Sequence, residues 1–378
     1  MTDRVERVAS SLLGSAPSKT PSVRALSSYA SHSDCATASL AFAARADLDR
    51  MCTGTDYESP IGQDPQAFQR GQTFEAMLKG NGYGALLDLL REEASFPPTA
   101  VRIEDLRTRY PRGTGGLKLR ARETRRLLQA IANGEDEAPN LIDGAVITGN
   151  VAGEVAYYEA DSLAAIAGGK LHVGEIKSFA YTDGRCDPEK FGAACDQAAW
   201  YILLCRRALQ DMGLDPHVVS DEAFIILPVG VGLTPTLLRQ NIAGKIRRAQ
   251  TLLETAPDPA ELLALHGPDL QFPGKELDPQ ARLDVLERLL DAVGTTYRPD
   301  SCLRDCGLAQ LCRARAHDRS LPQLCGSQVL RNLPGVGTLG RAAELAAGAA
   351  PGIGEDHAAR ALRQASTVYD RVLAGGAL

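Results

Sequence analysis

The spacing of hydrophobic residues divides the chain into a helical beginning, a middle part with strands and a helical end. Residues 1–50 carry apolar positions at helical spacing, and QAFQRGQTFEAMLKG (66–80) has the same period. A further helix, ETRRLLQAIANG, is expected to end at Gly134, because glycine is the residue that most often terminates a helix. The first third of the chain is therefore predicted to be helical.

The pattern changes at Leu141. NLIDGAVITGN, GEVAYYEADSLAAIA and KLHVGEIKSFA are β-branched or aromatic segments separated by turns, and they predict three consecutive antiparallel strands. Asp-Pro at 187–188 predicts the start of a helix that runs to Met212, and residues 222–230 form an apolar strand buried on both faces. Helices are expected over 234–293. This order predicts an α/β fold with a central mixed β-sheet flanked by helices and with helical N- and C-terminal extensions.

Composition excludes several classes of protein. Hydrophobic residues make up 44% and charged residues 23%, which suits a chain with a core rather than a disordered one. No apolar run approaches the roughly 20 residues of a membrane span, and the first residues lack the apolar stretch of a signal peptide. We therefore expect a cytoplasmic protein with no membrane partner.

The net charge is −6, yet one stretch is strongly basic. The segment between Val101 and Leu127 contains nine Lys and Arg residues and three acidic residues, which gives a local charge of +6. Such a stretch can hold a polyanion, and a solvated helix face is an equally good interpretation of the charge alone. The candidate DNA-contacting residues are Arg120, Arg122, Arg125 and Arg126.

Three of the nine cysteines lie within eleven residues, in SCLRDCGLAQLC (301–312). Thiolates bind zinc or iron–sulfur clusters, and both usually require four ligands. Cys302, Cys306 and Cys312 are therefore candidate ligands of a metal centre whose fourth ligand comes from elsewhere in the chain. Cys186, Cys195 and Cys205, in or near one apolar helical stretch, are interpreted as small core residues.

A lysine inside an apolar strand is unusual in a chain with eight lysines and 33 arginines. Alternation places Lys177 and Glu175 on one face of their strand. A three-residue hairpin loop at 168–170 would set Asp161 opposite Lys177 on that same face. A two-residue Gly-Gly loop would place Asp161 opposite Ile176, on the other face.

Two carboxylates and an ammonium group on one face suit phosphodiester hydrolysis. The carboxylates can hold Mg²⁺, which activates water and neutralises charge on a phosphate, and Lys177 can position the water or stabilise negative charge. For an isolated E-x-K pattern, a surface salt bridge is the better interpretation.

The wider pattern resembles the RecB-like PD-(D/E)XK nucleases, whose core is restriction-endonuclease-like. The resemblance consists of D-x13-E-x-K followed by Gln197 and Tyr201 four residues apart, and of RGQTFEAML upstream. It implies that Asp161, Glu175 and the Ile176 carbonyl bind Mg²⁺ or Mn²⁺. It also implies that Lys177 acts on water and that Gln197 and Tyr201 support the site. Glu75 stands where the family often has a histidine, and is the expected third carboxylate.

Several members of this family, including AddB-type subunits and a CRISPR adaptation nuclease, hold a [4Fe–4S] cluster with one cysteine before the nuclease core and three after it. LSSYASHSDCATASLAF resembles the segment with the first ligand, which implies Cys35; Cys52 and Cys325 are the alternatives. The downstream spacing is C-x3-C-x5-C, one residue longer than usual, so Zn²⁺ remains the alternative to iron–sulfur. The implied role is structural rather than redox.

APGIGEDHAARAL (350–362) resembles a helix–hairpin–helix element, in which Gly352 and Gly354 would offer backbone N–H groups to a DNA phosphate. An ordinary helix-capping glycine turn is an equal alternative. LPGVGTLGRAAEL is a looser copy, with Arg341 in the place of a small residue.

Taken with the resemblance, the sequence predicts a nuclease domain at 1–312 with its metal clasp, a linker at 313–331 and a helix–hairpin–helix-like segment at 332–378. The expected function is Mg²⁺- or Mn²⁺-dependent hydrolysis of DNA in repair, recombination or defence. An exonuclease on single-stranded or end-containing DNA is favoured, with a helicase or another repair or defence protein as partner. The alternative is a non-catalytic DNA-binding or structural subunit with a degenerate nuclease core and a metal staple.

Overall fold

A computed structural model describes residues 2–19, 22–58, 65–97, 101–111, 115–151, 154–167, 169–255, 259–267, 269–295 and 297–373. The chain divides into two compact units. Unit 1 comprises Met1–Arg7, Thr20–Ala30 and Gln63–Asp258, and unit 2 comprises Val8–Lys19, Ser31–Gly62 and Pro259–Leu378. The predicted boundaries at residues 312 and 331 both fall within unit 2, where helix α12 (Ala309–Asp318) spans the first of them.

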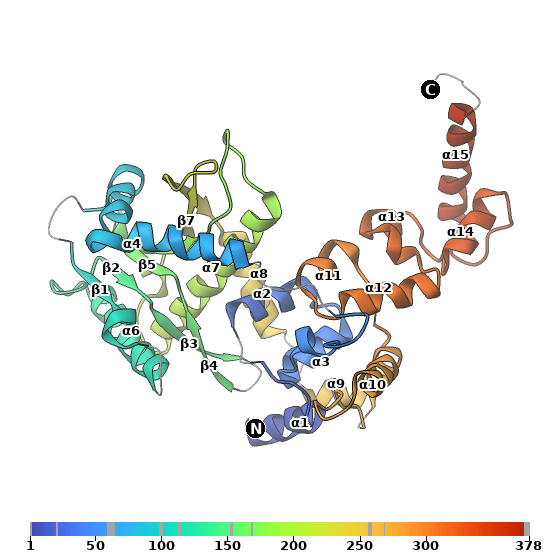
Figure 1. Ribbon diagram of the computed structural model, residues 1–378, viewed down its shortest axis with the longest axis horizontal. Helices are drawn as coiled ribbons and strands as arrows, with labels where there is room; N and C mark the ends of the chain where they lie inside the picture. The colour runs from blue at the N-terminus through green and yellow to red at the C-terminus, as the bar shows by residue number, and fades with distance from the viewer. Residues whose placement is uncertain are drawn as a thin grey trace. The chain divides into compact units, whose positions relative to one another are not determined.

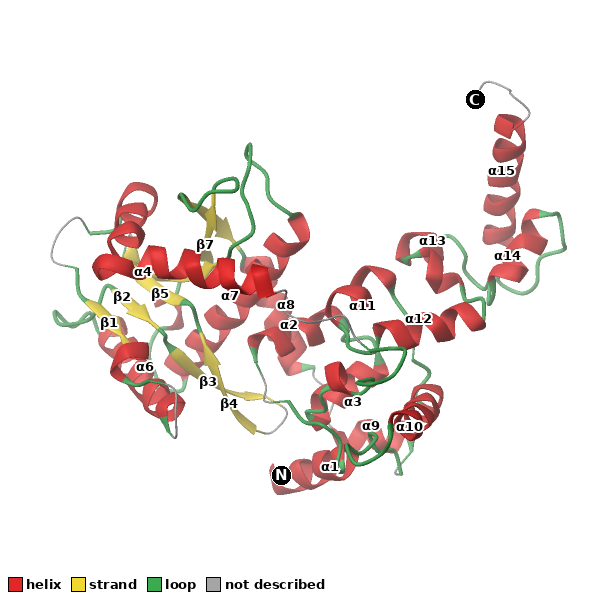
Figure 2. Ribbon diagram, viewed as in Figure 1, coloured by secondary structure: helices red, strands yellow, loops and turns green. Residues whose placement is uncertain are grey.

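Unit 1 contains the named strands of the described residues (Figure 2). They are β1 (Ile103–Asp105), β2 (Leu141–Asp143), β3 (Val146–Val151), β4 (Glu154–Glu159), β5 (Ser162–Ala167), β6 (Lys170–Ile176), β7 (Glu222–Pro228) and β8 (Pro235–Asn241). Six of them form one sheet in the order β1-β2-β5-β6-β7-β8, and β3 and β4 form a separate two-stranded sheet. The large sheet is mixed, since β1–β2 and β6–β7 are parallel and the other pairs antiparallel. The predicted mixed α/β class is therefore confirmed.

Helices cover this sheet (Figure 1). They are α4 (Pro65–Ala94), α5 (Leu106–Arg109), α6 (Gly116–Ala132), α7 (Pro188–Gln210) and α8 (Ala243–Glu254), with the 3-10 turn η2 (Pro216–Val218). Helix α7 contacts β3, β6 and β7, and α4 contacts β8. As predicted, α7 begins after Asp187, whose carboxylate accepts hydrogen bonds from the amides of Glu189 and Lys190.

Two of the strand predictions need correction. NLIDGAVITGN and GEVAYYEADSLAAIA do pair as antiparallel neighbours, but each is bent into two strands that belong to different sheets. The helix expected from Thr234 is wrong at its start, because residues 235–241 form strand β8. Seven paired positions along β7 stabilise this edge strand. Leu237 is the one fully buried residue of β8. The strand therefore lacks the alternation of buried and exposed residues from which it could have been predicted.

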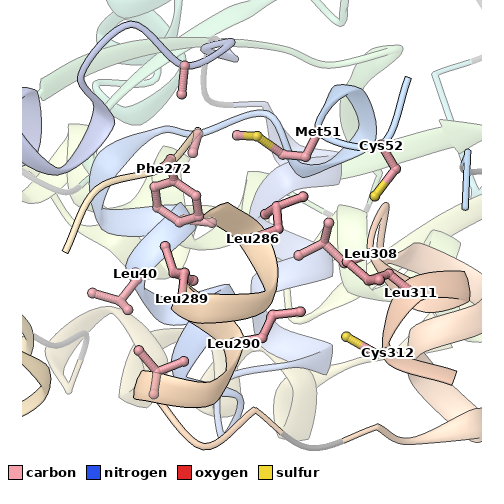
Figure 3. Close-up of a cluster of buried hydrophobic side chains, with 14 of the residues drawn as sticks. Leu40, Met51, Cys52, Phe272, Leu286, Leu289, Leu290, Leu308, Leu311 and Cys312 are labelled. Atoms are coloured by element: carbon pink, nitrogen blue, oxygen red, sulfur yellow. The ribbon is translucent and has the colours of Figure 1, made fainter. Parts of the chain in front are cut away.

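Unit 2 is helical in its described part. Its elements, with two N-terminal helices that both units share, are α1 (Thr2–Leu13), α2 (Val23–Ser31), α3 (Ala36–Ala44), η1 (Leu48–Arg50), α9 (Pro259–His266), α10 (Pro279–Ala292), α11 (Pro299–Asp305), α12, η3 (Pro322–Cys325), α13 (Ser327–Arg331), α14 (Leu339–Ala346) and α15 (Asp356–Leu373). Its main core joins residues 12–52 with residues 263–316, and Figure 3 shows Leu40, Leu286 and Leu290 within it. Segments that precede and follow the sheet in sequence thus share one hydrophobic core.

Among the described helices, none combines the length and the apolar character that crossing a bilayer would require.

Candidate active site and cysteine cluster

The candidate active site lies where the bent hairpin passes from one sheet to the other. Strand β2 ends at Asp143 and β4 ends at Glu159, and the amide of Ala160 donates to the carbonyl of Ala145 at 2.9 Å across the bend. Asp161 follows immediately, before β5 resumes the pairing with β6. The bend therefore brings acidic residues of both strands to one place beside the end of β6.

The register of β5 and β6 differs from both predicted versions. Ala167 pairs with Lys170, which leaves a two-residue loop, and Gly168 itself lies outside the described residues. A bulge between Ala164 and Ile166 then shifts the pairing by one residue, so that Ser162 pairs with Gly174. The next position brings Asp161 level with Glu175. The bulge thus places Asp161 on the same face of the sheet as Glu175, whereas a Gly-Gly loop without a bulge would have placed it on the opposite face.

Asp161, Glu175 and Lys177 do come together. The Lys177 Nζ lies 2.5 Å from Glu175 Oε1 and 3.9 Å from Asp161 Oδ2. Glu175 is only 2% exposed, and burial raises its pKa to about 7, although Lys177 acts in the opposite direction. Burial lowers the pKa of Lys177, but the two carboxylates outweigh it and raise the pKa, so the ammonium form is favoured.

Glu175 has an unused acceptor. Its Oε2 atom is buried and has no hydrogen-bond partner among the residues that the structure describes. A buried carboxylate oxygen without a donor costs free energy, roughly 1–3 kcal/mol or more. Such an oxygen atom is suited to bind a cation.

Glu75 reaches the same place from helix α4. Phe74 and Leu78 are fully buried against the sheet, which turns the neighbouring Glu75 toward the bend. Its Oε1 atom accepts from Lys79 Nζ and from Arg107 Nη1, each at 2.5 Å. Burial acts against ionisation of Glu75, but these two cations lower its pKa below the usual value.

Sequence reasoning missed Lys79, Asp143 and Tyr83. Lys79 Nζ lies 2.6 Å from Asp143 Oδ1, and Tyr83 donates its hydroxyl proton to Asp143 Oδ2 at 2.9 Å. Tyr83 is held by a kink in α4, where residues 80–83 leave helical geometry. The four-residue spacing of Glu75 and Lys79 was a local signal for an ion pair. No sequence pattern indicated that Asp143 would lie beside Glu75 and Lys79.

Gln197 and Tyr201 occupy one face of α7, one turn apart. Tyr201 is buried and donates a hydrogen bond to the Glu159 carbonyl at 2.5 Å. Its pKa is raised well above the usual value by burial and, to a smaller extent, by Glu175 and Asp161. Gln197 is half-buried. The tyrosine supports the bend in the strand that carries Asp161.

Arg120 differs from its expected role as a surface DNA contact. Its side chain is 1% exposed, and its Nη1 and Nη2 atoms lie 3.1 and 3.0 Å from the two carboxylate oxygens of Glu159. A buried bidentate pair leaves the guanidinium unavailable to DNA. The basic stretch had suggested an exposed face, but residue 120 lies on the buried face of α6.

The other three arginines of this set remain on the surface. Arg122, Arg125 and Arg126 are exposed on α6, and Arg126 pairs with Glu123 at 2.7 Å. Lys118 is also exposed on this helix. An exposed basic face therefore persists without Arg120.

The four candidate cysteines all lie in unit 2, with Cys302 and Cys312 in its main core, Cys306 packed against that core and Cys35 at the start of α3. Burial raises the pKa of the Cys302, Cys306 and Cys312 thiols, and for all three Cys35 is among the neighbours that raise it further. Arg298 donates its amide proton to Cys302 Sγ at 3.4 Å, and the amides of Thr37 and Ala38 act on Cys35. Cysteine sulfurs with amide donors are suited to be thiolate ligands.

Two contacts join the N-terminal segment of unit 2 to the segment that carries Cys302 and Cys306. Arg298 forms an ion pair with Asp34, next to Cys35 at the start of α3. Gly307 lies so close to the backbone of residues 48–49 that an added Cβ would be 2.3 Å from the Leu48 carbonyl oxygen. Only glycine fits at this position.

The two alternative fourth ligands have different surroundings. Cys52 is fully buried in the core that also contains Met51, Leu308 and Leu311 (Figure 3). Burial raises its pKa to about 11, although Arg282 acts in the opposite direction. Cys325 is exposed.

The C-terminal glycine turns pack against each other. Leu333, Val336, Leu345 and Ala358 belong to a small separate core of α14 and α15. Arg341 forms an ion pair with Glu355 at 2.7 Å, and Glu355 Oε2 accepts the amide proton of Gly352 at 2.7 Å. A carboxylate thus already uses one of the amides that the resemblance assigns to phosphate.

Within the described ranges, no group of three or more His, Cys, Asp or Glu side chains is arranged so that it could hold a metal ion as it stands. In the candidate active site, Lys79, Arg107 and Lys177 pair with the carboxylates instead.

Comparison of the chain with protein-family models, with curated proteins and with solved structures finds no match.

Proposed function

We propose that this chain is a metal-dependent DNA nuclease with a restriction-endonuclease-like core of the RecB-like PD-(D/E)XK type. The observation that carries the proposal is the cluster of Asp161, Glu175 and Lys177 at the end of β6, with Lys177 Nζ 2.5 Å from Glu175 and 3.9 Å from Asp161. Two carboxylates beside an ammonium group are suited to metal-dependent hydrolysis of a phosphodiester.

The donor set suits Mg²⁺ or Mn²⁺. Asp161, Glu175 and Glu75 offer carboxylate oxygens, and the Ile176 carbonyl is the fourth protein ligand that the family resemblance suggests. The buried Oε2 atom of Glu175 supports this fit, because it has no hydrogen-bond partner in the described part of the chain. When bound, the cation would lower the pKa of a water molecule and neutralise charge on the phosphate.

The protein groups would act around that cation. Lys177 would give up its pairing with Glu175 and hold the attacking water or the negative charge that develops on the phosphate. Tyr201 would keep the bent strand in place through its bond to the Glu159 carbonyl, and Gln197 would lie one turn away. Lys79 and Tyr83 would fix Asp143 behind the site.

Cys35, Cys302, Cys306 and Cys312 would hold a [4Fe–4S] cluster, with Zn²⁺ as the alternative. The position of Cys302 and Cys312 in one core, with Cys306 packed against it, supports the proposal, as do the amide donors to Cys35 and Cys302. Thiols raise one another's pKa when they are buried together, and a bound cationic centre would keep them as thiolates. The centre would join the helices before and after the sheet unit in sequence.

DNA would contact the exposed basic face of α6 and the C-terminal turns. Deleting residues 332–378 should weaken DNA binding several-fold without altering the candidate active site, because those residues have their own core. The loss should be independent of base sequence and should shrink as salt rises, since the contacts are to phosphates. Fluorescence anisotropy with labelled DNA at several salt concentrations measures it.

Two outcomes of this deletion would contradict the DNA-binding role. If the truncated chain unfolds, the segment serves packing. If it folds and binds DNA as tightly as the full chain, the exposed residues Arg122, Arg125 and Arg126 are the main contact. Cleavage at saturating DNA should survive the deletion in either folded case.

One experiment separates the nuclease from a non-catalytic subunit. Protein purified without oxygen is analysed for iron, sulfide and zinc and is then incubated with end-labelled single- and double-stranded DNA, with and without Mg²⁺. The proposal predicts metal-dependent cleavage, and the fragment pattern will distinguish release from ends from internal cuts. A stoichiometric metal centre with no cleavage under any condition would favour the structural subunit.

A further inference from the structure

The basic stretch contributes one residue to the carboxylate cluster itself. Arg107 lies on α5, a single turn that follows β1 and contacts β2. Its Nη1 atom lies 2.5 Å from Glu75 Oε1 and its Nε atom 3.1 Å from Glu159 Oε1. Its Nη2 atom is 4.0 Å from Asp161 Oδ1. One guanidinium thus spans carboxylates from α4, β4 and the bend.

The backbone makes room for this side chain. Gly144 has a φ of +65°, and an added Cβ would lie 2.2 Å from Arg107 Cγ and 3.1 Å from Arg120 Nη1. The bend after β2 therefore needs glycine both for its own conformation and for the passage of the two arginines.

Exposure separates the cluster into a buried part and an accessible part. The side chains of Asp143 and Glu175 are 4% and 2% exposed, and that of Lys79 is 12% exposed. The side chains of Arg107 and Lys177 are 32% and 29% exposed. The carboxylates of Glu75 and Asp161 are also accessible, at 29% each. Arg107 and Lys177 are the two cations that solvent reaches most readily here.

The charges of the cluster are nearly balanced. Its carboxylates are those of Glu75, Asp143, Glu159, Asp161 and Glu175, and its cations are Lys79, Arg107, Arg120 and Lys177. Five carboxylates with four cations leave a formal charge of −1. A divalent cation would change this to +1, which a phosphodiester anion would then balance.

We propose that Arg107 changes partners: without a divalent cation it pairs with Glu75 and Glu159, and with the cation bound it turns to the phosphate of the DNA. The proposal rests on the nuclease function proposed above. Once a cation satisfies Glu75 and Asp161, the guanidinium fork is released at the accessible side of the cluster, and it matches a phosphate in geometry. Glu159 keeps its bidentate partner Arg120, and so needs no replacement.

The test measures cation binding and DNA binding separately. Ca²⁺ serves as the probe, because it takes oxygen ligands and allows binding to be measured without relying on cleavage. In Arg107→Met, calorimetry should show Ca²⁺ binding roughly three- to tenfold tighter, since a competing cation is gone. The same variant should bind a short single-stranded DNA at least about tenfold more weakly in Ca²⁺, because a charge-assisted contact is lost.

Arg109→Met is the matched control. Arg109 lies on the same turn, is 53% exposed and pairs with Glu104 at 3.1 Å, outside the cluster. The Arg109→Met substitution should leave Ca²⁺ affinity unchanged. It should lower DNA affinity only by the small amount expected for the loss of a surface charge that salt screens. Arg107→Lys keeps the charge but not the fork, so Ca²⁺ affinity should stay close to wild type while DNA affinity falls.

Weaker or unchanged Ca²⁺ binding in a folded Arg107→Met variant would overturn the proposal, as would unchanged DNA affinity in it. If that variant unfolds, the Arg107→Lys variant tests the proposal instead. Wild-type DNA affinity in Arg107→Lys would overturn it. A wild-type protein that binds no divalent cation at the cluster would instead contradict the nuclease function itself. The two failures are therefore distinguishable.

Discussion

Replacing Lys177 or Glu175 by alanine is expected to lower DNA cleavage to below about one per cent of the wild-type rate. Loss of one preorganised charged group at such a site costs about 10²–10³ in rate. The two side chains pair with each other at 2.5 Å and face the bend rather than the hydrophobic core. Circular dichroism and the affinity for DNA should therefore change little. Cleavage is measured with excess enzyme, so that the rate of a single turnover is compared.

Lys245→Ala is the control for this pair. Lys245 joins α8 to α7 through an ion pair with Asp196 at 2.6 Å, in the same unit but outside the carboxylate cluster. Its loss should leave cleavage at the wild-type rate. If Lys177→Ala or Glu175→Ala cleaves DNA as fast as this control, the cluster is not an active site.

Replacing Cys35 by serine is expected to remove most of the bound metal and to lower the melting temperature of unit 2. Cys35 lies before the sheet unit in sequence and its three partners lie after it, so the metal centre would be a long-range cross-link. A loss of a few kcal/mol lowers the Tm of a unit of this size by roughly 5–10 °C. Metal analysis and differential scanning calorimetry, on protein purified without oxygen, give both quantities.

Cys325→Ser provides the comparison, because Cys325 is exposed. It should retain full metal content and an unchanged Tm. Gly307→Ala keeps every thiol but forces the backbone of residues 48–49 away, and should lower the Tm together with the metal content. Full metal occupancy in Cys35→Ser would show that Cys52 or another residue is the fourth ligand, and zinc without iron would leave the cross-link but exclude the cluster.

The sequence was sufficient to predict features that depend on residues close together in the chain. The alternation in VGEIKS puts Glu175 and Lys177 on one face, and the Asp-Pro start of α7 is present as predicted. The proximity of Asp161 was anticipated for an incorrect reason, because the loop has two residues and a bulge corrects the register. Bulges leave little trace in an apolar strand sequence.

Tertiary structure decided the rest. Arg107 and Arg120 were indistinguishable from their neighbours within a basic stretch, yet one enters the carboxylate cluster and the other is buried against Glu159. Asp143 and Lys79 are 64 residues apart and meet only because the bend in the hairpin faces α4. The sequence resemblance already preferred Cys35 to Cys52, whereas the burial of Cys52 in a hydrophobic core could be known only from the fold.

Cleavage of end-labelled DNA by the wild-type chain, in Mg²⁺ or Mn²⁺ and again after chelation by EDTA, tests the central claim most directly. The account predicts phosphodiester hydrolysis that requires the divalent cation, stops in EDTA and returns when the cation is restored. Equal cleavage with and without EDTA, or no cleavage of single- or double-stranded DNA in either cation by folded protein with its metal centre intact, would contradict it.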